Sequence, residues 1–319
     1  MKQFLKTAVK GAVSFGLIFL FLQSVDWQDI VSAAATADLW MLIAAVFFFV
    51  MSNCLGAVQW RALLRMQEIT LPFGQVLLLY FVGVFFNNFM VGNIGGDAVR
   101  IYDLKRLTGK GVSGFAATFL DRFIGLFTLS CFSVVAFVLT PALWTPGLIT
   151  PIAVLGLGLL SILCFGFSRR LSGWVVQVCE RVLPQGVAKL VRDIRESFLL
   201  YRHAYGMLGK VGIIACGVQL CRVAVYFCVG IALGQAVAFV HYMIFIPLIA
   251  IVAAVPISFG GLGVRENMGA LLLGRVGVEP ATALTLMFLG YLAGILASLI
   301  GGAAFVARRT AQEVEGVKT

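Results

Sequence analysis

The sequence predicts an all-α, polytopic integral membrane protein with about six full transmembrane helices and two re-entrant or broken-helix hairpins related by an inverted repeat. Hydrophobic residues make up 61% of the 319 residues and charged residues only 12%, whereas a soluble domain is about half apolar and a quarter charged. The apolar residues form runs long enough to cross a hydrocarbon core of about 30 Å as helices. Two of these runs are interrupted by glycine-rich motifs that end in arginine.

The N-terminal segment sets the orientation of the chain. Lys2, Lys6 and Lys10 precede the first apolar run, Gly11–Leu22, and lysines beside a first helix favour the cytoplasmic side. We expect this helix to be retained in the protein. The alternative is a signal peptide cleaved near Ala33–Ala35, which leaves the rest of the topology unchanged.

Five further runs are expected to cross the membrane completely. They are Leu39–Val58, Val112–Thr140, Leu148–Phe167, Val211–Gly234 and Ala281–Ala307. With the N-terminus inside, the last crossing leads to a cytoplasmic tail, 308–319, so both termini are expected in the cytoplasm. The whole chain, 1–319, is expected to form a single transmembrane domain.

Two stretches between these crossings are expected to form hairpins. The first enters at Leu71–Phe86 and breaks near Gly92–Gly96, and the second enters at Ala238–Val255 and breaks at Pro256–Gly263. Basic residues flank both ends of the first hairpin, so both ends should lie inside, whereas the second hairpin opens outward. This scheme puts the basic residues on the cytoplasmic side, apart from five that it places in the membrane: Arg100, Arg122, Arg222, Arg265 and Arg275.

The segment 168–210 is basic and cytoplasmic in this scheme. Apolar residues recur in it at helical spacing, among them Leu171, Val175 and Val178. We therefore expect an amphipathic segment that lies at the anionic membrane surface. A solvated loop packed on the helix ends is the alternative.

The two breaks carry the same motif. Gly95–Arg100 reads GGDAVR and Gly260–Arg265 reads GGLGVR. Glycine permits positive φ and close backbone approach, the N–H groups at a helix start attract anions, and arginine adds a two-pronged donor suited to phosphate. Opposed broken helices at mid-depth are typical of transporters built from inverted repeats. Glycines that serve helix packing, with arginines anchored at the interface, are the alternative.

Polar side chains in these apolar stretches are the candidate binding residues. A charge at the bilayer centre costs about 2.5–3.5 kcal/mol, so these groups must pair, hydrate or lie near an interface. The surplus of arginine over acid suits an anionic head group, although Asp121-Arg122 also fits a helix start and Asn87-Asn88 also fits helix packing. The candidate set is Asn87, Asn88, Gly95, Gly96, Asp97, Arg100, Asp121, Arg122, Arg222, Gly260, Gly261, Gly263, Arg265 and Glu266.

Catalytic and metal centres are not expected. The seven cysteines lie almost entirely in apolar runs, and His203 and His241 are far apart, so the usual zinc and disulfide patterns are missing. The sequence has no nucleophile–base pair and no phosphate-cradling loop. The net charge of +10 comes without a nucleic-acid-binding module. We therefore expect no enzyme activity, no metal, no cofactor and no nucleic-acid partner.

The motifs resemble those of one known family. Asn87-Asn88 with Gly95–Arg100, Asp121–Leu126 and Pro256–Glu266 are similar to the flippase-like transmembrane domain of lysylphosphatidylglycerol synthases, over nearly the whole chain. The resemblance implies a protein of the bacterial cytoplasmic (inner) membrane that binds or translocates lipids. Some stand-alone relatives are linked with hopanoid or glycolipid pathways. Because few residues follow Arg309, the soluble aminoacyl-transferring domain of the synthases is not expected here.

Three functions follow from these observations. The first is the binding and translocation of an anionic phospholipid, glycolipid or isoprenoid lipid by the two motifs. The second is a membrane lipid-phosphate transferase, for which Asp97 or Glu266 would supply acid–base chemistry. The third is a non-transporting partner of a soluble or membrane enzyme of envelope-lipid biosynthesis, docked through the segment 168–210. The sequence leaves the oligomeric state open.

Overall fold

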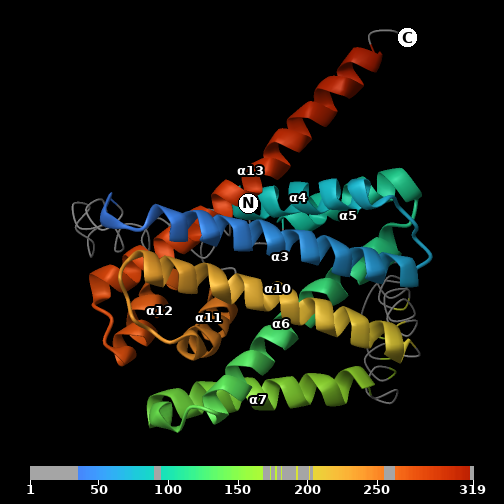
Figure 1. Cartoon of the computed structure of the whole chain (residues 1–319). Helices are drawn as coiled ribbons and strands as arrows, with labels where there is room; N and C mark the ends of the chain where they lie inside the picture. The colour runs from blue at the N-terminus through green and yellow to red at the C-terminus, as the bar shows by residue number, and fades with distance from the viewer. Residues whose placement is uncertain are drawn as a thin grey trace, which may run out of the picture.

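The computed structural model describes residues 35–89, 95–167, 204–254 and 263–316, with single positions 173, 177, 181, 192 and 201 between them. Within these residues the chain is a bundle of helices without strands (Figure 1). The expected first crossing, most of the segment 168–210, and the motif residues Gly260 and Gly261 lie outside the described residues.

The five predicted crossings that fall within the described residues are all helices. They are α3 (Leu39–Met66), α6 (Gly111–Val138), α7 (Pro146–Phe167), α10 (Tyr205–Ala232) and α13 (Pro280–Gly316). Four of them, α3, α6, α10 and α13, contain long apolar stretches of a length that crosses a membrane. The predicted all-α membrane fold is therefore confirmed.

The helix ends differ from the predicted boundaries where polar residues continue a helix beyond its apolar run. Asp38 starts α3 by accepting hydrogen bonds from the N–H groups of Trp40 and Met41, at 2.8 and 3.4 Å, as an N-cap side chain does. The same helix continues past Val58 to Met66. The last crossing likewise continues into the expected tail, and the end of α13 projects beyond the other helices (Figure 1).

Two pairs of shorter helices form the expected hairpins. The first pair is α4 (Phe73–Phe89) and α5 (Gly95–Thr108), and the second is α11 (Phe239–Ala254) and α12 (Val264–Leu273). These arms have 17, 14, 16 and 10 residues, whereas a full crossing needs about 20. In each pair the two arms pack against one another.

The packing of the helices repeats between the two halves of the chain. Helices α3, α4, α5 and α6 of the first half correspond to α10, α11, α12 and α13 of the second. The contact of α4 with α13 matches that of α11 with α6, and the contact of α5 with α6 matches that of α12 with α13. The contact of α3 with α4 likewise matches that of α10 with α11. The equivalent helices α3 and α10 form the most extensive pair and lie side by side in Figure 1. They are antiparallel, since the Asp38 N–H at the start of α3 donates to the Ala232 carbonyl at the end of α10, at 3.0 Å. Equivalent helices that run in opposite directions make the repeat an inverted one.

The two hairpins open toward opposite ends of α6. Beyond α5, Lys110 precedes the first residue of α6 and its Nζ donates to the Glu68 carbonyl at 3.1 Å, next to the end of α3. Beyond α12, the 3₁₀ turn Gly274–Val276 places the Arg275 Nη1 3.3 Å from the Thr145 Oγ1, in the connection between the end of α6 and the start of α7. Arg275, which was expected in a membrane-embedded stretch, is exposed in this turn, just beyond the end of α12 at Leu273.

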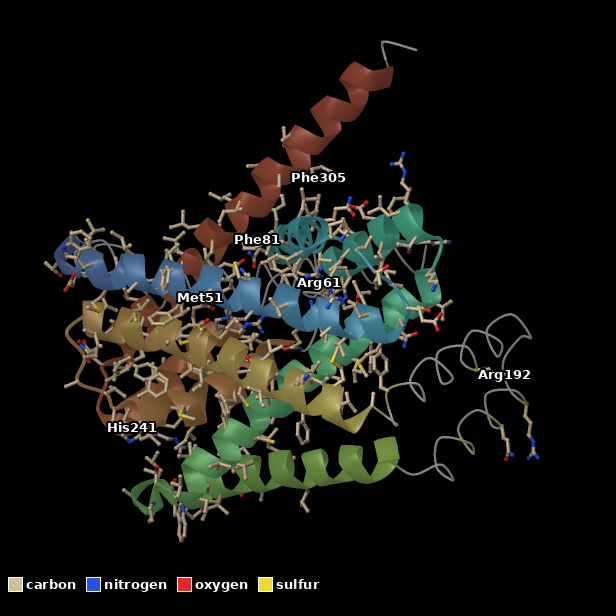
Figure 2. All side chains as sticks on the ribbon, turned by 45° about the vertical axis from the view of Figure 1, so that its right-hand side comes forward. Met51, Arg61, Phe81, Arg192, His241 and Phe305 are labelled. Carbon is tan, nitrogen blue, oxygen red and sulfur yellow. The ribbon has the colours of Figure 1, made fainter. Side chains whose placement is uncertain are left out.

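Close backbone approach joins the first hairpin to α13. A Cβ added at Gly301 of α13 would lie 2.0 Å from the Phe81 carbonyl oxygen, so glycine is required there. One turn further along both helices, the rings of Phe86 and Phe305 lie edge to face with their centroids 5.1 Å apart. Figure 2 shows Phe81 and Phe305 at this junction. The first hairpin is therefore held by the last helix of the chain.

Candidate functional site

The first motif begins α5 directly against α4. Glycine is required at position 96, because a Cβ there would lie 1.8 Å from the Gly83 carbonyl oxygen. The Gly96 N–H donates to the Asn87 Oδ1 at 2.9 Å, so one of the unpaired N–H groups at the helix start has a side-chain partner. Gly95 begins the helix and Gly96 is buried. The motif thus uses its glycines for close packing, and this packing sets the position of Asp97 and Arg100.

Asp97, Arg100, Asp121 and Arg122 form a network of opposite charges, most of it buried. The Arg100 Nη2 lies 3.4 Å from the Asp97 Oδ1 and 3.4 Å from the Asp121 Oδ2. The Arg122 Nε donates to the other oxygen of Asp97. Asp97, Arg100 and Asp121 are each 7% exposed or less, while the side chain of Arg122 is 40% exposed. Pairing explains how these charges are accommodated at membrane depth.

Two aromatic rings enclose the guanidinium group of Arg100. Its Cζ lies 4.4 Å from the ring centroid of Trp60 and 4.9 Å from that of Tyr80, distances at which cation–π attraction operates. Trp60 is fully buried and its Nε1 donates to the Thr118 Oγ1 at 3.1 Å. Arg100 is therefore held by two carboxylates and two rings.

Helices α3 and α10 add amide and arginine side chains to this network. The Gln59 Nε2 donates to the Asp121 Oδ1 at 2.9 Å. On α10, Gln219 is buried and its Nε2 lies 3.0 Å from the Cβ position of Gly125, one turn beyond Asp121. Arg222 lies close enough to Asp121 to interact with its charge. Among the described residues, Arg222 has no carboxylate at ion-pair distance.

We refer to Gln59, Asp97, Arg100, Asp121, Arg122, Gln219 and Arg222 as the polar cluster. It joins α3, α5, α6 and α10. The three arginines outnumber the two aspartates, so the cluster carries one net positive charge. An excess positive charge in a low-dielectric surrounding favours an anionic ligand.

The second motif is built differently from the first. Gly263 has a φ of 81°, a conformation that favours glycine. Its N–H donates to the Glu266 Oε2 at 2.7 Å, so the side chain of Glu266, which is fully buried, satisfies a backbone N–H at the start of α12. The Arg265 Cζ lies 4.7 Å from the ring centroid of Tyr291 on α13.

Tyr291 also reaches the first hairpin. Its hydroxyl donates to the Asn88 carbonyl oxygen at the end of α4, at 3.4 Å. The structure therefore brings Arg265 and Asn88 to the same tyrosine, although their positions in the sequence are far apart. It assembles Asp97, Arg100, Asp121, Arg122 and Arg222 separately, around α6.

The family of the chain follows from comparison with known proteins. The family described as the lysylphosphatidylglycerol synthase TM region matches residues 7–302. The chain belongs to this family. It is 22% identical over 312 residues to a UPF0104 membrane protein of Pyrococcus horikoshii, with 90% of this chain and 92% of the relative covered. It is 23% identical over 319 residues to a UPF0104 membrane protein of Methanothermobacter thermautotrophicus, with 89% of each chain covered.

In this member of the lysylphosphatidylglycerol synthase TM-region family, five side chains extend the predicted site: the aromatic residues Trp60, Tyr80 and Tyr291 and the amides Gln59 and Gln219. The spacing of Gln219 three residues before Arg222 would have placed both on one helix face. Gln59 and Trp60 lie just past the apolar run that ended the predicted crossing at Val58. Neither these two residues nor Tyr291 carries a sequence signal of a site. Within the described residues, no three His, Cys, Asp or Glu side chains are grouped to hold a metal ion.

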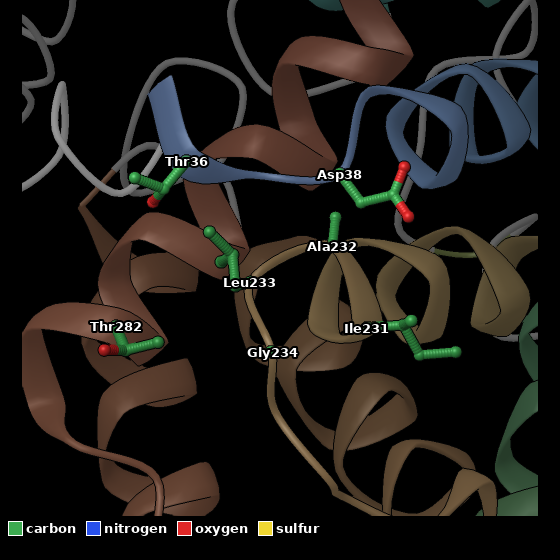
Figure 3. A pocket seen from close by; sticks show the side chains of 7 residues that line it. All are labelled: Thr36, Asp38, Ile231, Ala232, Leu233, Gly234 and Thr282. Atoms are coloured by element: carbon green, nitrogen blue, oxygen red, sulfur yellow. The ribbon is translucent and has the colours of Figure 1, made fainter.

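In this family member, an open hollow of about 360 Å³ lies outside the polar cluster. It is formed where α3 and α13 begin and α10 ends, and Figure 3 shows its lining residues: Thr36, Asp38, Ile231, Ala232, Leu233, Gly234 and Thr282. Asp38 and Gln59 are 21 positions apart on α3, or about 30 Å at 1.5 Å per residue. The hollow is therefore separate from the polar cluster, and its Asp38 carboxylate already caps α3.

Proposed function

We propose that the protein binds an anionic lipid and translocates its head group across the cytoplasmic (inner) membrane through the polar cluster. The observation that carries the proposal is the grouping of three arginines, of which Arg100 is buried, with only two aspartates, both buried, among apolar helices. Charges in the membrane interior mark ligand and ion pathways. The acyl chains of the lipid would stay in the bilayer while the head group crosses.

The inverted repeat supports transport in particular. Folds with two opposed hairpins expose a central site alternately to each face when one repeat moves against the other. Here the polar cluster lies where helices of both halves meet, because α3, α5 and α6 come from the first half and α10 from the second. Relative movement of the halves would therefore change the surroundings of the cluster.

Arg222 is the candidate for direct contact with the phosphate. Arg100 is enclosed by carboxylates and rings, so its first role is to hold Asp97 and Asp121. Arg222 contributes charge to the cluster without a carboxylate at ion-pair distance among the described residues. Arg122, whose side chain is 40% exposed, is placed to meet a head group that arrives from outside the cluster. No step of the proposed function changes a covalent bond of the lipid.

The proposal is tested with purified protein in liposomes that contain a fluorescently labelled phosphatidylglycerol. Dithionite, which bleaches the label only in the outer leaflet, reports how fast the lipid exchanges between leaflets. The wild type should accelerate exchange, and Arg222→Gln should lower the rate at least tenfold. Arg275→Gln, which removes an exposed arginine at the end of the second hairpin, is the matched control and should keep the rate.

Two outcomes would contradict the proposal. Equal rates for the wild type, Arg222→Gln and protein-free liposomes would mean that the protein does not translocate this lipid. A non-transporting partner of an envelope-lipid biosynthesis enzyme would then be the better account. Conversion of the labelled lipid into a new chemical species would favour a transferase.

A further inference from the structure

The carboxyl group of Glu266 is buried with one of its oxygens unsatisfied. The residue is 0% exposed. Its Oε2 accepts the Gly263 N–H at 2.7 Å, whereas its Oε1 has no hydrogen-bond partner among the described residues. A carboxylate is far more costly to bury than the neutral acid unless its oxygens are fully paired. The state of the second hairpin therefore depends on whether Glu266 carries a proton.

The position of this carboxyl group is fixed by the start of α12. Both polar groups of the Gly263 backbone are held by side chains of the first turn, since the Asn267 Nδ2 donates to the Gly263 carbonyl at 2.6 Å. One turn further along, a Cβ added at Gly269 would lie 2.2 Å from the Met287 Cγ, so this face of α12 lies directly against α13. Glu266 precedes Gly269 by three positions and shares that face. Water reaches its carboxyl group only when the second hairpin moves.

One cation lies beside Glu266. The charge of Arg265 acts on the Glu266 carboxyl group, and both groups act on Tyr291, which is the one titratable residue of α13 between Pro280 and Ala307. Among the described residues of the second hairpin, Glu266 is the only acidic one. The remaining titratable groups of the hairpin lie at its open end, where α11 begins and α12 has ended: His241, Tyr242 and Arg275.

Protonation of Glu266 changes the net charge beside Arg265. When the carboxyl group is ionised, it neutralises the arginine, and the pair carries no net charge. When Oε1 holds a proton, the positive charge of Arg265 is left to attract an anion. A proton at Glu266 and an anion at Arg265 therefore favour each other's binding, and this coupling is reciprocal.

The second motif lies beside the hairpin that carries part of the polar cluster. Tyr291, whose ring faces Arg265, donates to the Asn88 carbonyl at the end of α4. The neighbouring Asn87 side chain accepts the N–H of Gly96 at the start of α5. Arg265 and Glu266 are thus placed next to the break from which Asp97 and Arg100 of the polar cluster extend.

We infer that Glu266 carries a proton across the membrane together with each lipid anion, so that the protein is a proton–lipid cotransporter. This inference rests on the proposed function and adds its energy source. The proton binds to Oε1 from the water at one face, and the anion then enters with Arg265 no longer neutralised. After the two repeats have moved, the anion leaves, the proton passes to water at the other face, and the carboxylate neutralises Arg265 again. One proton and one anion move together, so no net charge crosses.

A pH gradient across liposomes tests this coupling. The liposomes consist of phosphatidylcholine with a trace of labelled phosphatidylglycerol, and valinomycin with equal potassium on both sides holds the membrane potential at zero. With the outside more acidic by about one pH unit, one proton per lipid corresponds to a leaflet ratio of up to about tenfold. The wild type should therefore concentrate the label in the inner leaflet, where dithionite does not reach it. Reversal of the gradient should reverse the ratio, and protein-free liposomes provide the background.

Glu266→Gln assigns the coupling to this carboxyl group. The variant keeps an oxygen that accepts the Gly263 N–H, but it cannot exchange a proton. Whatever its exchange rate, its final distribution should be the same with and without the gradient. Glu279→Gln, at an exposed position just before α13, is the matched control and should respond to the gradient as the wild type does. A gradient response that survives in Glu266→Gln would overturn the inference.

The dependence of the exchange rate on pH, without a gradient, gives a second measurement. The wild-type rate should fall as the pH rises and Glu266 remains ionised, because the carboxylate then neutralises Arg265. If Glu266→Gln fails to fold, Glu266→Asp decides the question, since its shorter side chain moves the carboxyl group relative to Gly263 and Arg265. This variant should shift the pH at which the rate is half-maximal, and an unchanged pH profile would overturn the inference.

The same liposomes separate failure of this inference from failure of the proposed function. Rapid exchange by the wild type with the same final distribution in the presence and absence of the gradient would overturn proton coupling and leave lipid translocation intact. Exchange no faster than in protein-free liposomes would overturn the proposed function, and the inference with it.

Discussion

The guanidinium carbon of Arg265 lies 4.7 Å from the ring centroid of Tyr291. The hydroxyl of the same tyrosine donates to the Asn88 carbonyl oxygen at 3.4 Å. Arg265 begins the return arm of the second hairpin and Asn88 ends the entering arm of the first. Tyr291 on α13 thus contacts both broken helices.

Substitution of Tyr291 separates the ring contact from the hydrogen bond. Tyr291→Phe keeps the ring and should lower the free energy of unfolding by about 0.5–1.5 kcal/mol, the contribution of one hydrogen bond. Tyr291→Leu also removes the ring and should cost about 0.5–2 kcal/mol more, because cation–π attraction to Arg265 is lost. Denaturant unfolding in detergent measures both. Equal losses in the two variants would show that the ring contact with Arg265 contributes nothing.

Arg100 and Asp121 should be energetically coupled. Removing one member of a buried ion pair removes charge compensation from the other, so Arg100→Leu and Asp121→Leu should each destabilise the protein, by up to about 3–5 kcal/mol. Asp97 remains as a partner of Arg100 in Asp121→Leu, so this loss should be the smaller one. The double variant should lose clearly less than the sum of the single losses, because the charge that each single variant leaves less compensated is then absent. The double-mutant cycle is measured by denaturant unfolding, and additive losses would contradict the pairing.

The junction of α4 and α5 should not tolerate a side chain at position 96. The Cβ of Gly96→Ala would overlap the Gly83 carbonyl oxygen and the Asn87 backbone nitrogen. Because backbone cannot rotate aside, we expect a loss of about 3 kcal/mol or more. Gly74→Ala, in the same hairpin but with open space around its Cβ, is the control and should be neutral or stabilise by up to about 1 kcal/mol. A tolerated Gly96→Ala would contradict the close approach of the two arms.

The sequence predicted the helices and hairpins because bilayer thickness and charge placement restrict both. Apolar runs had to be helices, and basic residues at both ends of Leu71–Phe86 required a chain reversal. It could not predict that α3 continues to Met66 and thereby brings Gln59 and Trp60 to Asp121. The roles of the two motif arginines were equally inaccessible, because Arg100 and Arg265 match in sequence while Trp60, Tyr80 and Tyr291 come from other helices.

In the polar cluster, too, contacts within one helix could be predicted from the sequence, whereas contacts between helices could not. Asp97 and Arg100 are three positions apart on α5, so their proximity follows from helical geometry. Their pairing with Asp121 and Arg122 depends on how α5 packs on α6, which no local pattern in the sequence specifies. The sequence already shows that the apolar stretches contain more arginines than acidic residues. Only the structure shows that these arginines come together where the two inverted halves meet.

Side-specific labelling of the two hairpins tests the inverted arrangement most directly. Single cysteines are placed at Arg106, at the end of α5, and at Arg275, beyond the end of α12, in a variant without the seven native cysteines. A membrane-impermeant maleimide applied to intact cells should label Arg275→Cys, and it should label Arg106→Cys only after the membrane is permeabilised. Labelling of both positions from the same side of the membrane would contradict hairpins that enter from opposite faces.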